Sequence, residues 1–113
     1  MQGSYPLLTL GITAGGALAA NRFVTGAGAY PSAAAGARGV TRTSAAGAGD
    51  LTPIDILGTT IVEAGGPISK DAALEVGANG VAVTKTGGVL VGYALEAASS
   101  GQLIEVLLAG PTA

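Results

Sequence analysis

The chain has 113 residues, 20 of them glycine, and its five basic and seven acidic residues give a net charge of −2. This length fits one domain with a modest core, and so few basic residues provide no patch for a phosphate backbone, which argues against nucleic-acid binding. Cysteine and histidine are absent, which excludes disulfides, zinc–thiolate sites and the commonest general base.

The N-terminal segment carries no charged side chain before residue 22 and contains "ALA" at 17–19, which resembles a signal-peptidase site. A signal peptide needs Lys or Arg before its apolar core, and none is present here. Pro6, Gly11 and Gly15 also interrupt the segment. We therefore expect neither a cleaved signal nor a membrane-spanning helix.

Residues 1–8 are interpreted as an arm that lies on a neighbouring subunit or on another partner. Tyr5, Leu7 and Leu8 are large apolar residues in a chain that has few, and proteins normally cover such an edge. Pro6 cannot donate a ladder hydrogen bond, so regular pairing is expected to begin near Leu8. The alternative is a strand folded onto its own core.

Short β-strands are predicted along residues 9–110, which we interpret as a single domain followed by a tail at 111–113. Glycine or proline recurs every few residues, a spacing that long helices do not survive. The stretch "GAGAYPSAAAGARG" at 26–39 is interpreted as a long loop. Apolar residues elsewhere alternate with period two, which is typical of strands; the sets are Leu8, Leu10 and Ile12; Val81 and Val83; Val89, Val91, Tyr93 and Leu95; and Ile104, Val106 and Leu108.

Two conformations compete for "GYALEAASSGQLIEVLL" at 92–108. Ala, Leu and Glu favour a helix in its first half. Period two nevertheless continues through both flanks of the Ser-Ser-Gly segment. We therefore predict strands at 89–96 and 102–108, with a turn region at Ala97–Gly101.

The chain also repeats itself. "ITAGGALAANRFV" at 12–24 matches "VEAGGPISKDAAL" at 62–74, and "GVTRTSAAGAGDLTPIDIL" at 39–57 resembles 92–108, with Ile54-Asp55-Ile56 matched to Ile104-Glu105-Val106. Two copies are too few for a solenoid. We predict an all-β fold, a small antiparallel β-barrel or β-sandwich with two loosely repeated halves and little helix. Chance similarity in an Ala/Gly-rich chain is the alternative.

Motifs for cofactors, metals and catalysis all fail. "VTGAGAYP" has Pro31 where a dinucleotide-binding turn requires its third glycine, and "GANGVAVTKTGG" has Thr84 where a Walker loop requires glycine. Asp50, Asp55 and Asp71 are scattered and form no calcium loop. We therefore predict no cofactor, no metal site and no enzymatic activity.

Four further residues are candidates for contact with a partner. Arg38 and Arg42 have no acidic residue next to them in sequence, and they either pair with acids on another chain or lie on a solvated strand face. Phe23 and Tyr30 are two of the four aromatic residues and could share a loop, as the aromatic residues of a sugar-binding site do. Only 11% of residues are charged, below the ~25% of a typical soluble domain, which favours a surface that contacts other protein.

A short N-terminal strand is followed by "ITAGGALAANRFV", a long loop of small residues, "GVTRTSAAGAGDLTPIDILGT", "ISKDAALEV", "NGVAVTKTGG" and "VLVGYALEAASSGQLIEVLL". This order and spacing resembles the small capsid decoration, or cement, proteins of tailed bacteriophages over residues 8–108. In that family a Gly-Val-Ala-like strand, an Ala/Gly turn and an alternating strand occur mid-chain and again at the C-terminus. The corresponding segments here are 39–57 and 91–108.

The resemblance implies a β-rich structural protein on the outer surface of the virion, which binds an assembled capsid and stabilises it by bridging major capsid subunits. It also implies a homo-oligomer, with a trimer favoured over a dimer. A surface-displayed carbohydrate-binding or adhesin-type β module is the alternative, although the aromatic residues are dispersed. The candidate residues for capsid or subunit contacts are Tyr5, Pro6, Leu7, Leu8, Phe23, Tyr30, Arg38 and Arg42.

Overall fold

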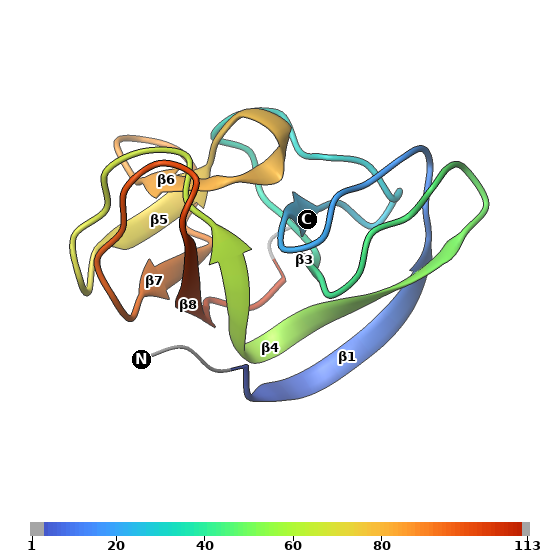
Figure 1. Cartoon of the computed structure of the whole chain (residues 1–113), viewed down its shortest axis with the longest axis horizontal. Coiled ribbons are helices and arrows are strands. Elements are labelled where there is room, and N and C mark those ends of the chain that lie inside the picture. Colours follow the sequence, from blue (N-terminus) through green and yellow to red (C-terminus); the bar gives the residue numbers. More distant parts are fainter. Residues whose placement is uncertain (1–3, 112–113) are drawn as a thin grey trace.

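The computed structural model describes residues 4–111, and within this range strands and loops make up the chain without an α-helix (Figure 1). One short 3-10 turn, η1, spans Ala78–Gly80. No helix in this range is long and apolar enough to cross a membrane. The strands are β1 (Pro6–Thr13), β2 (Phe23–Val24), β3 (Gly39–Thr41), β4 (Leu51–Glu63), β5 (Ala73–Val76), β6 (Ala82–Thr84), β7 (Gly92–Ala94) and β8 (Leu103–Leu108).

The strands form one antiparallel sheet that curls into a nearly closed barrel. Their hydrogen-bonded order is β2-β3-β4-β8-β7-β5-β6, and β1 pairs with β4 outside this path. An isolated parallel bridge joins Ala64, which follows β4, to Ala82 in β6. This bridge brings the first and last strands of the C-terminal portion together. The all-β prediction is confirmed, and of the two predicted forms the structure adopts the barrel.

The two predicted halves are visible in the strand pairing, and β4 belongs to both. Its first part pairs with β1 and β3, whereas its second part pairs with β8. An isolated bridge between Leu18 and Ala45 links two loops of the first half, and the bridge between Ile68 and Ala98 repeats it in the second. The sequence repeat therefore corresponds to a structural repeat.

One equivalence between the halves differs from the one inferred from the sequence. The register pairs Thr41 with Ile54 in the first half and Ala94 with Val106 in the second. Ile54 is thus equivalent to Val106, so the predicted match with Ile104 is wrong by two residues. An alternating apolar pattern matches itself at every shift of two, and only the pairing partners decide between such shifts.

Gly39 and Gly92 occupy equivalent positions where β3 and β7 approach their neighbouring strands. A Cβ on Gly39 would lie 2.5 Å from the carbonyl oxygen of Asp55, and one on Gly92 would lie 2.7 Å from that of Leu107. We predict that either Gly39→Ala or Gly92→Ala lowers the free energy of unfolding by about 1–3 kcal/mol, because the backbone must shift. Gly47→Ala, which meets nothing within 4 Å, is the control. Urea denaturation measures the effect, and equal stability of all three variants would contradict it.

Small residues fill most of the core, and Phe23 is the one aromatic residue in the described chain that is fully buried. A larger cluster lies around Phe23, Leu74 and Ile104, and a smaller one around Val24 and Ile54. These clusters leave many large apolar side chains outside the core. The protein therefore presents an apolar surface as well as an apolar interior.

The C-terminal stretch is strand–turn–strand, as predicted, but its first strand is shorter than expected. β7 comprises only Gly92–Ala94, and β8 comprises Leu103–Leu108. Val91 is buried whereas Tyr93 is 42% exposed, so the prediction that they share one face is wrong. The side chain of Ala94 occupies the core, and Tyr93, its neighbour in the strand, therefore points outward.

Glu75 in β5 holds the loop that follows β6. One carboxylate oxygen, Oε1, accepts backbone N–H bonds from Thr86 at 2.7 Å, Gly88 at 3.0 Å and Gly87 at 3.3 Å. These bonds, that of Thr86 foremost, hold the pKa of Glu75 below its ordinary value of 4.5, although burial of the carboxyl acts in the opposite direction.

We predict that acid weakens this loop. A carboxylate whose pKa is lowered by folding contributes stability above its unfolded-state pKa, and this contribution is lost as the pH falls through the folded-state pKa. Below pH 4.5, the Tm of the wild type should therefore decline more steeply than that of Glu75→Gln, whose amide does not titrate. Thermal scans over a pH series measure both slopes, and parallel curves would contradict the assignment.

Candidate interaction surface

β1 and the first part of β4 form a two-stranded ribbon at the periphery of the barrel (Figure 1). Among the described strands β1 pairs only with β4. Pairing begins at Tyr5, whose N–H donates to the Thr59 carbonyl over 3.1 Å, and not near Leu8 as expected. Residues 1–3 of the expected arm lie outside the described residues. Contact of residues 1–8 with a neighbouring subunit stays a prediction.

Five leucines of this ribbon are exposed, and we call them the ribbon leucines. Leu7 and Leu51 are the most exposed, at 83% and 77%. Leu10 lies opposite the buried Ile54, and Leu51 lies opposite Thr13, so leucines emerge on both faces of the ribbon. The ribbon leucines are Leu7, Leu8, Leu10, Leu51 and Leu57.

A row of side chains crosses the sheet from Tyr5, which precedes β1, to β7, and we call it the outer row. Thr59 in β4 lies between Tyr5 and Leu107, and Leu107 lies opposite Tyr93. Directly opposed residues share a face of the sheet. Tyr5 is 71% exposed, and Leu107 and Tyr93 are each just over 40% exposed. The exposed apolar surface therefore extends over strands of both halves.

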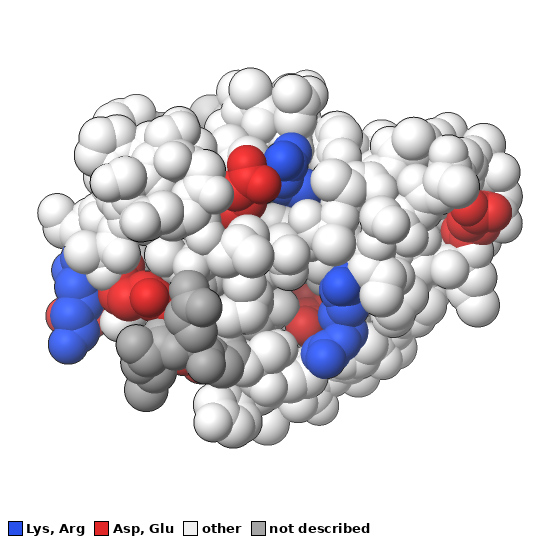
Figure 2. Space-filling view, in the orientation of Figure 1, with Lys and Arg blue, Asp and Glu red and all other residues white. Residues whose placement is uncertain are grey.

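Charged side chains are few and scattered over the face shown in Figure 2, which is otherwise uncharged. Residues 4–13, which include β1, contain no Asp, Glu, Lys or Arg. Within residues 4–111 no cluster of three or more acidic residues is placed to hold a metal ion. The surface of β1 itself is thus uncharged and suited to apolar contact.

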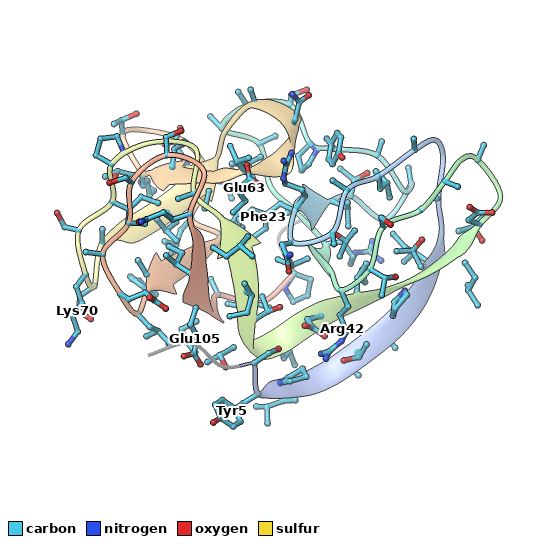
Figure 3. All side chains as sticks on the ribbon, in the orientation of Figure 1. Tyr5, Phe23, Arg42, Glu63, Lys70 and Glu105 are labelled. Atoms are coloured by element: carbon cyan, nitrogen blue, oxygen red, sulfur yellow. The ribbon has the colours of Figure 1, made fainter. Side chains whose placement is uncertain are left out.

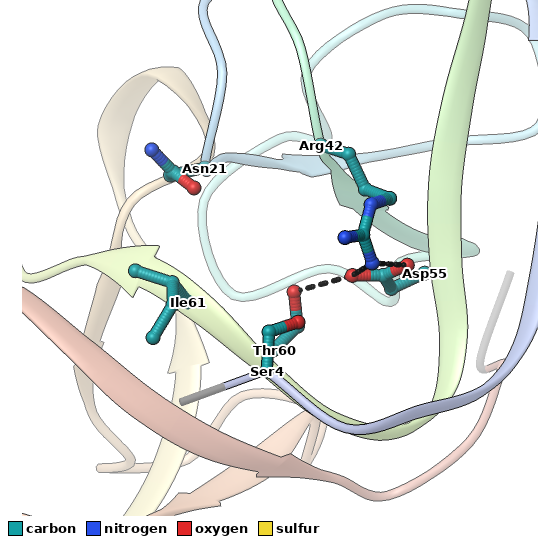
Figure 4. A pocket seen from close by; sticks show the side chains of 6 residues that line it. All are labelled: Ser4, Asn21, Arg42, Asp55, Thr60 and Ile61. Carbon is teal, nitrogen blue, oxygen red and sulfur yellow. Dashed lines mark hydrogen bonds and ion pairs between the residues drawn. The ribbon is translucent and has the colours of Figure 1, made fainter. Parts of the chain in front are cut away.

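Arg42 forms an ion pair with Asp55 inside the chain. Its Nη1 lies 3.0 Å from Oδ1 and 3.2 Å from Oδ2 of Asp55 (Figure 4). Asp55 is 1% exposed, and its carboxylate also accepts hydroxyl bonds from Thr9 at 2.9 Å and Thr60 at 2.7 Å. This network joins the ribbon to the segment that follows β3.

The other predicted contact residues divide into core and surface. Phe23 is 1% exposed and belongs to the core (Figure 3). The hydroxyl oxygen of Tyr30, which is half-buried, accepts the N–H of Ala19 over 2.7 Å. Arg38 is exposed, and its guanidinium lies over Gly26. Because Phe23 is buried, Phe23 and Tyr30 do not form a shared aromatic platform for a sugar.

Sequence reasoning missed several exposed residues of this surface. The signal for Leu107 was present, since alternation of Ile104, Val106 and Leu108 places it on the opposite face of β8. Leu51 carried no such signal. Its exposure follows from its position at the start of β4, where it lies over Gly11 rather than over the core.

A solved structure and a family model resemble the chain. The structure, described as the crystal structure of the head fiber gp8.5 N base in bacteriophage phi29, superimposes with a TM-score of 0.76 at 22% sequence identity, covering 94% of this chain and 97% of that chain. At this identity the likeness concerns the fold. No curated protein matches the chain. A family model described as phage cement protein matches residues 2–109. This match spans nearly the whole barrel, and the chain therefore belongs to the phage cement protein family.

Proposed function

We propose that this protein binds the outer surface of an assembled phage capsid and stabilises it by bridging neighbouring major capsid subunits. As a phage cement protein it is a capsid-associated structural component of the virion and not an enzyme. The outward location, the major capsid protein as partner and the bridging role are the proposed steps.

The observation that carries the proposal is the uncharged, exposed ribbon. Monomeric proteins rarely expose large contiguous apolar patches, and those that do use them for interaction. Interface centres are likewise depleted in charge and enriched in aromatic residues. The ribbon leucines and the exposed Tyr5 and Tyr93 of the outer row have this composition, because they are apolar or aromatic and carry no charge. A capsid surface that covers them would remove them from water.

Bridging is supported by the extent of this surface. The ribbon leucines lie in the first half of the repeat, whereas Leu107 and Tyr93 lie on β8 and β7 of the second half. A flat or concave seam between two capsid subunits could therefore contact one half with each subunit. A protein held in this way opposes separation of the two subunits.

The direct test uses capsids assembled without this protein. Purified protein is added, unbound protein is removed by sedimentation, and the decorated particles are examined by cryo-electron microscopy and by heating. Density over the junctions between major capsid subunits, with particles that resist heating better than undecorated ones, is the expected result. Density inside the shell, or binding without any stabilisation, would overturn the proposal.

We also propose a homotrimer as the bound form. The core consists mostly of Ala and Val, and many large apolar side chains lie on the surface, so an isolated monomer leaves much apolar area in water. Light scattering of purified protein at micromolar concentration should give three times the mass of one chain. A monomer in solution that also binds capsids as single copies would contradict the trimer.

A further inference from the structure

A polar hollow of about 170 Å³ lies beside the ribbon, between the start of β1, the middle of β4 and the turn that precedes β2 (Figure 4). It opens to solvent, and its walls carry hydrogen-bond donors from two separate turns of the chain. The residues that line it are Ser4, Asn21, Arg42, Asp55, Thr60 and Ile61.

The Arg42 guanidinium in this hollow is held in place by Asp55, but only one of its three nitrogen atoms takes part in that contact. Its Nη1 bonds both oxygens of Asp55, and Asp55 receives Thr9 and Thr60 as well. The Asp55 carboxylate is therefore saturated and hidden. Within residues 4–111 neither Nη2 nor Nε of Arg42 reaches an acceptor, and the Arg42 side chain is 40% exposed. A fixed guanidinium edge with two parallel donors remains open toward the hollow.

Asn21 forms the opposite wall. Its backbone is fixed by two hydrogen bonds, since its N–H donates to the Thr41 carbonyl at 2.9 Å and its carbonyl accepts the N–H of Glu63 at 3.0 Å. It adopts a left-handed φ of 62°. In the described part of the chain its side-chain amide makes no hydrogen bond. Figure 4 shows the Asn21 and Arg42 side chains on opposite sides of the hollow.

We propose that this hollow is a binding site for a carboxylate carried by a partner protein chain. A carboxylate matches the paired donors of a guanidinium edge in plane and spacing. The Asn21 amide lies on the opposite wall and offers a further donor when its NH2 group turns toward the hollow. The Arg42–Asp55 pair is neutral overall, so directional hydrogen bonds, and not a net positive charge, would hold the incoming carboxylate. An acidic side chain docked here would add a polar anchor beside the ribbon leucines. The inference rests on the proposed function for the identity of that partner, but the site itself does not.

The site is tested first on the protein alone, with acetate as the probe. In an NMR titration the Arg42 Nε–H and the Asn21 side-chain amide should shift saturably with acetate, and chloride at equal ionic strength should not reproduce the shifts. Asn21→Gly removes the amide without backbone strain, because glycine accepts a φ of 62°. It should weaken acetate binding at least threefold with Tm unchanged. Absent or non-saturable shifts, or shifts identical with chloride, would overturn the site.

A second arm identifies the source of the carboxylate. Asn21→Asp places a negative charge opposite Arg42, and the fold tolerates it because Asp71 holds the equivalent position in the second half with a φ of 67°. Weaker decoration of capsids by at least tenfold, with oligomeric state unchanged, assigns the carboxylate to the capsid protein. Loss of the oligomer instead assigns it to a second copy. If capsid decoration and oligomeric state are both unchanged in Asn21→Asp, the site binds no partner and the inference fails. Failure of the wild-type protein to decorate capsids would instead refute the proposed function alone.

Discussion

Replacing Arg42 by methionine should destabilise the protein more than replacing Arg42 and Asp55 together. In the Arg42→Met variant the Asp55 carboxylate, only 1% exposed, keeps its two hydroxyl donors but loses its counter-charge. Leaving a buried charge unpaired costs about 3–5 kcal/mol. Because Arg42 is 40% exposed, water reaches part of the site and we expect about 2–3 kcal/mol.

The double variant Arg42→Met with Asp55→Asn removes the charge along with its partner. The neutral amide still accepts a hydroxyl bond from Thr9 or Thr60, so we expect it to recover at least half of the loss. Lys70→Met, at an exposed cation, is the matched control and should change stability by less than about 0.5 kcal/mol. Urea denaturation of the variants measures all three values. If Arg42→Met is as stable as the double variant, the ion pair is not required to keep the Asp55 carboxylate buried.

The fold was predictable from the sequence because its signals are local and repeated. Glycine spacing excluded long helices, and alternation located β8. The repeat anticipated two halves that share one barrel. Alternation did not determine the register of the strands. The sequence match aligns Ile54 with Ile104, whereas the structure aligns it with Val106. A period-two pattern is unchanged by a shift of two residues, so the pattern alone does not separate the two alignments. Strand pairing across the barrel resolves that ambiguity, and pairing is a long-range property.

The exposed apolar surface was predictable only where an apolar residue had no core to enter. Tyr5, Leu7 and Leu8 fitted that description, and all three are exposed. Phe23 did not fit it, because a large aromatic residue in a chain of small residues is equally suited to the core. In the structure Phe23 is buried there. Arg42 lies just after β3 and Asp55 lies in β4, so their pairing depends on how the loop between these strands folds. The sequence contained both residues but no indication of their distance.

Exchanging two ribbon leucines for serine should abolish most of the affinity for capsids while leaving the fold intact. Leu7 and Leu51 are 83% and 77% exposed in the free chain, so Leu7→Ser and Leu51→Ser remove little core packing, and the Tm should stay near that of the wild type. Burying a leucine side chain against a partner contributes about 1.5–3 kcal/mol. Two of them therefore account for about 3–6 kcal/mol, and we expect affinity to fall at least ~100-fold.

The control must be apolar and exposed but lie outside the ribbon. Val89 meets this requirement, since it is 42% exposed and lies in the loop between β6 and β7. Val89→Ser should bind capsids within about twofold of the wild type if the ribbon is the docking surface. Titration of undecorated capsids with each labelled variant gives the affinities, and circular dichroism verifies the fold. Equal loss of binding in the Val89 variant would mean that general surface hydrophobicity drives association. Full binding by the double leucine variant would exclude the ribbon, because no docked arrangement that covers Leu7 and Leu51 is indifferent to replacing them with hydroxyl-bearing side chains.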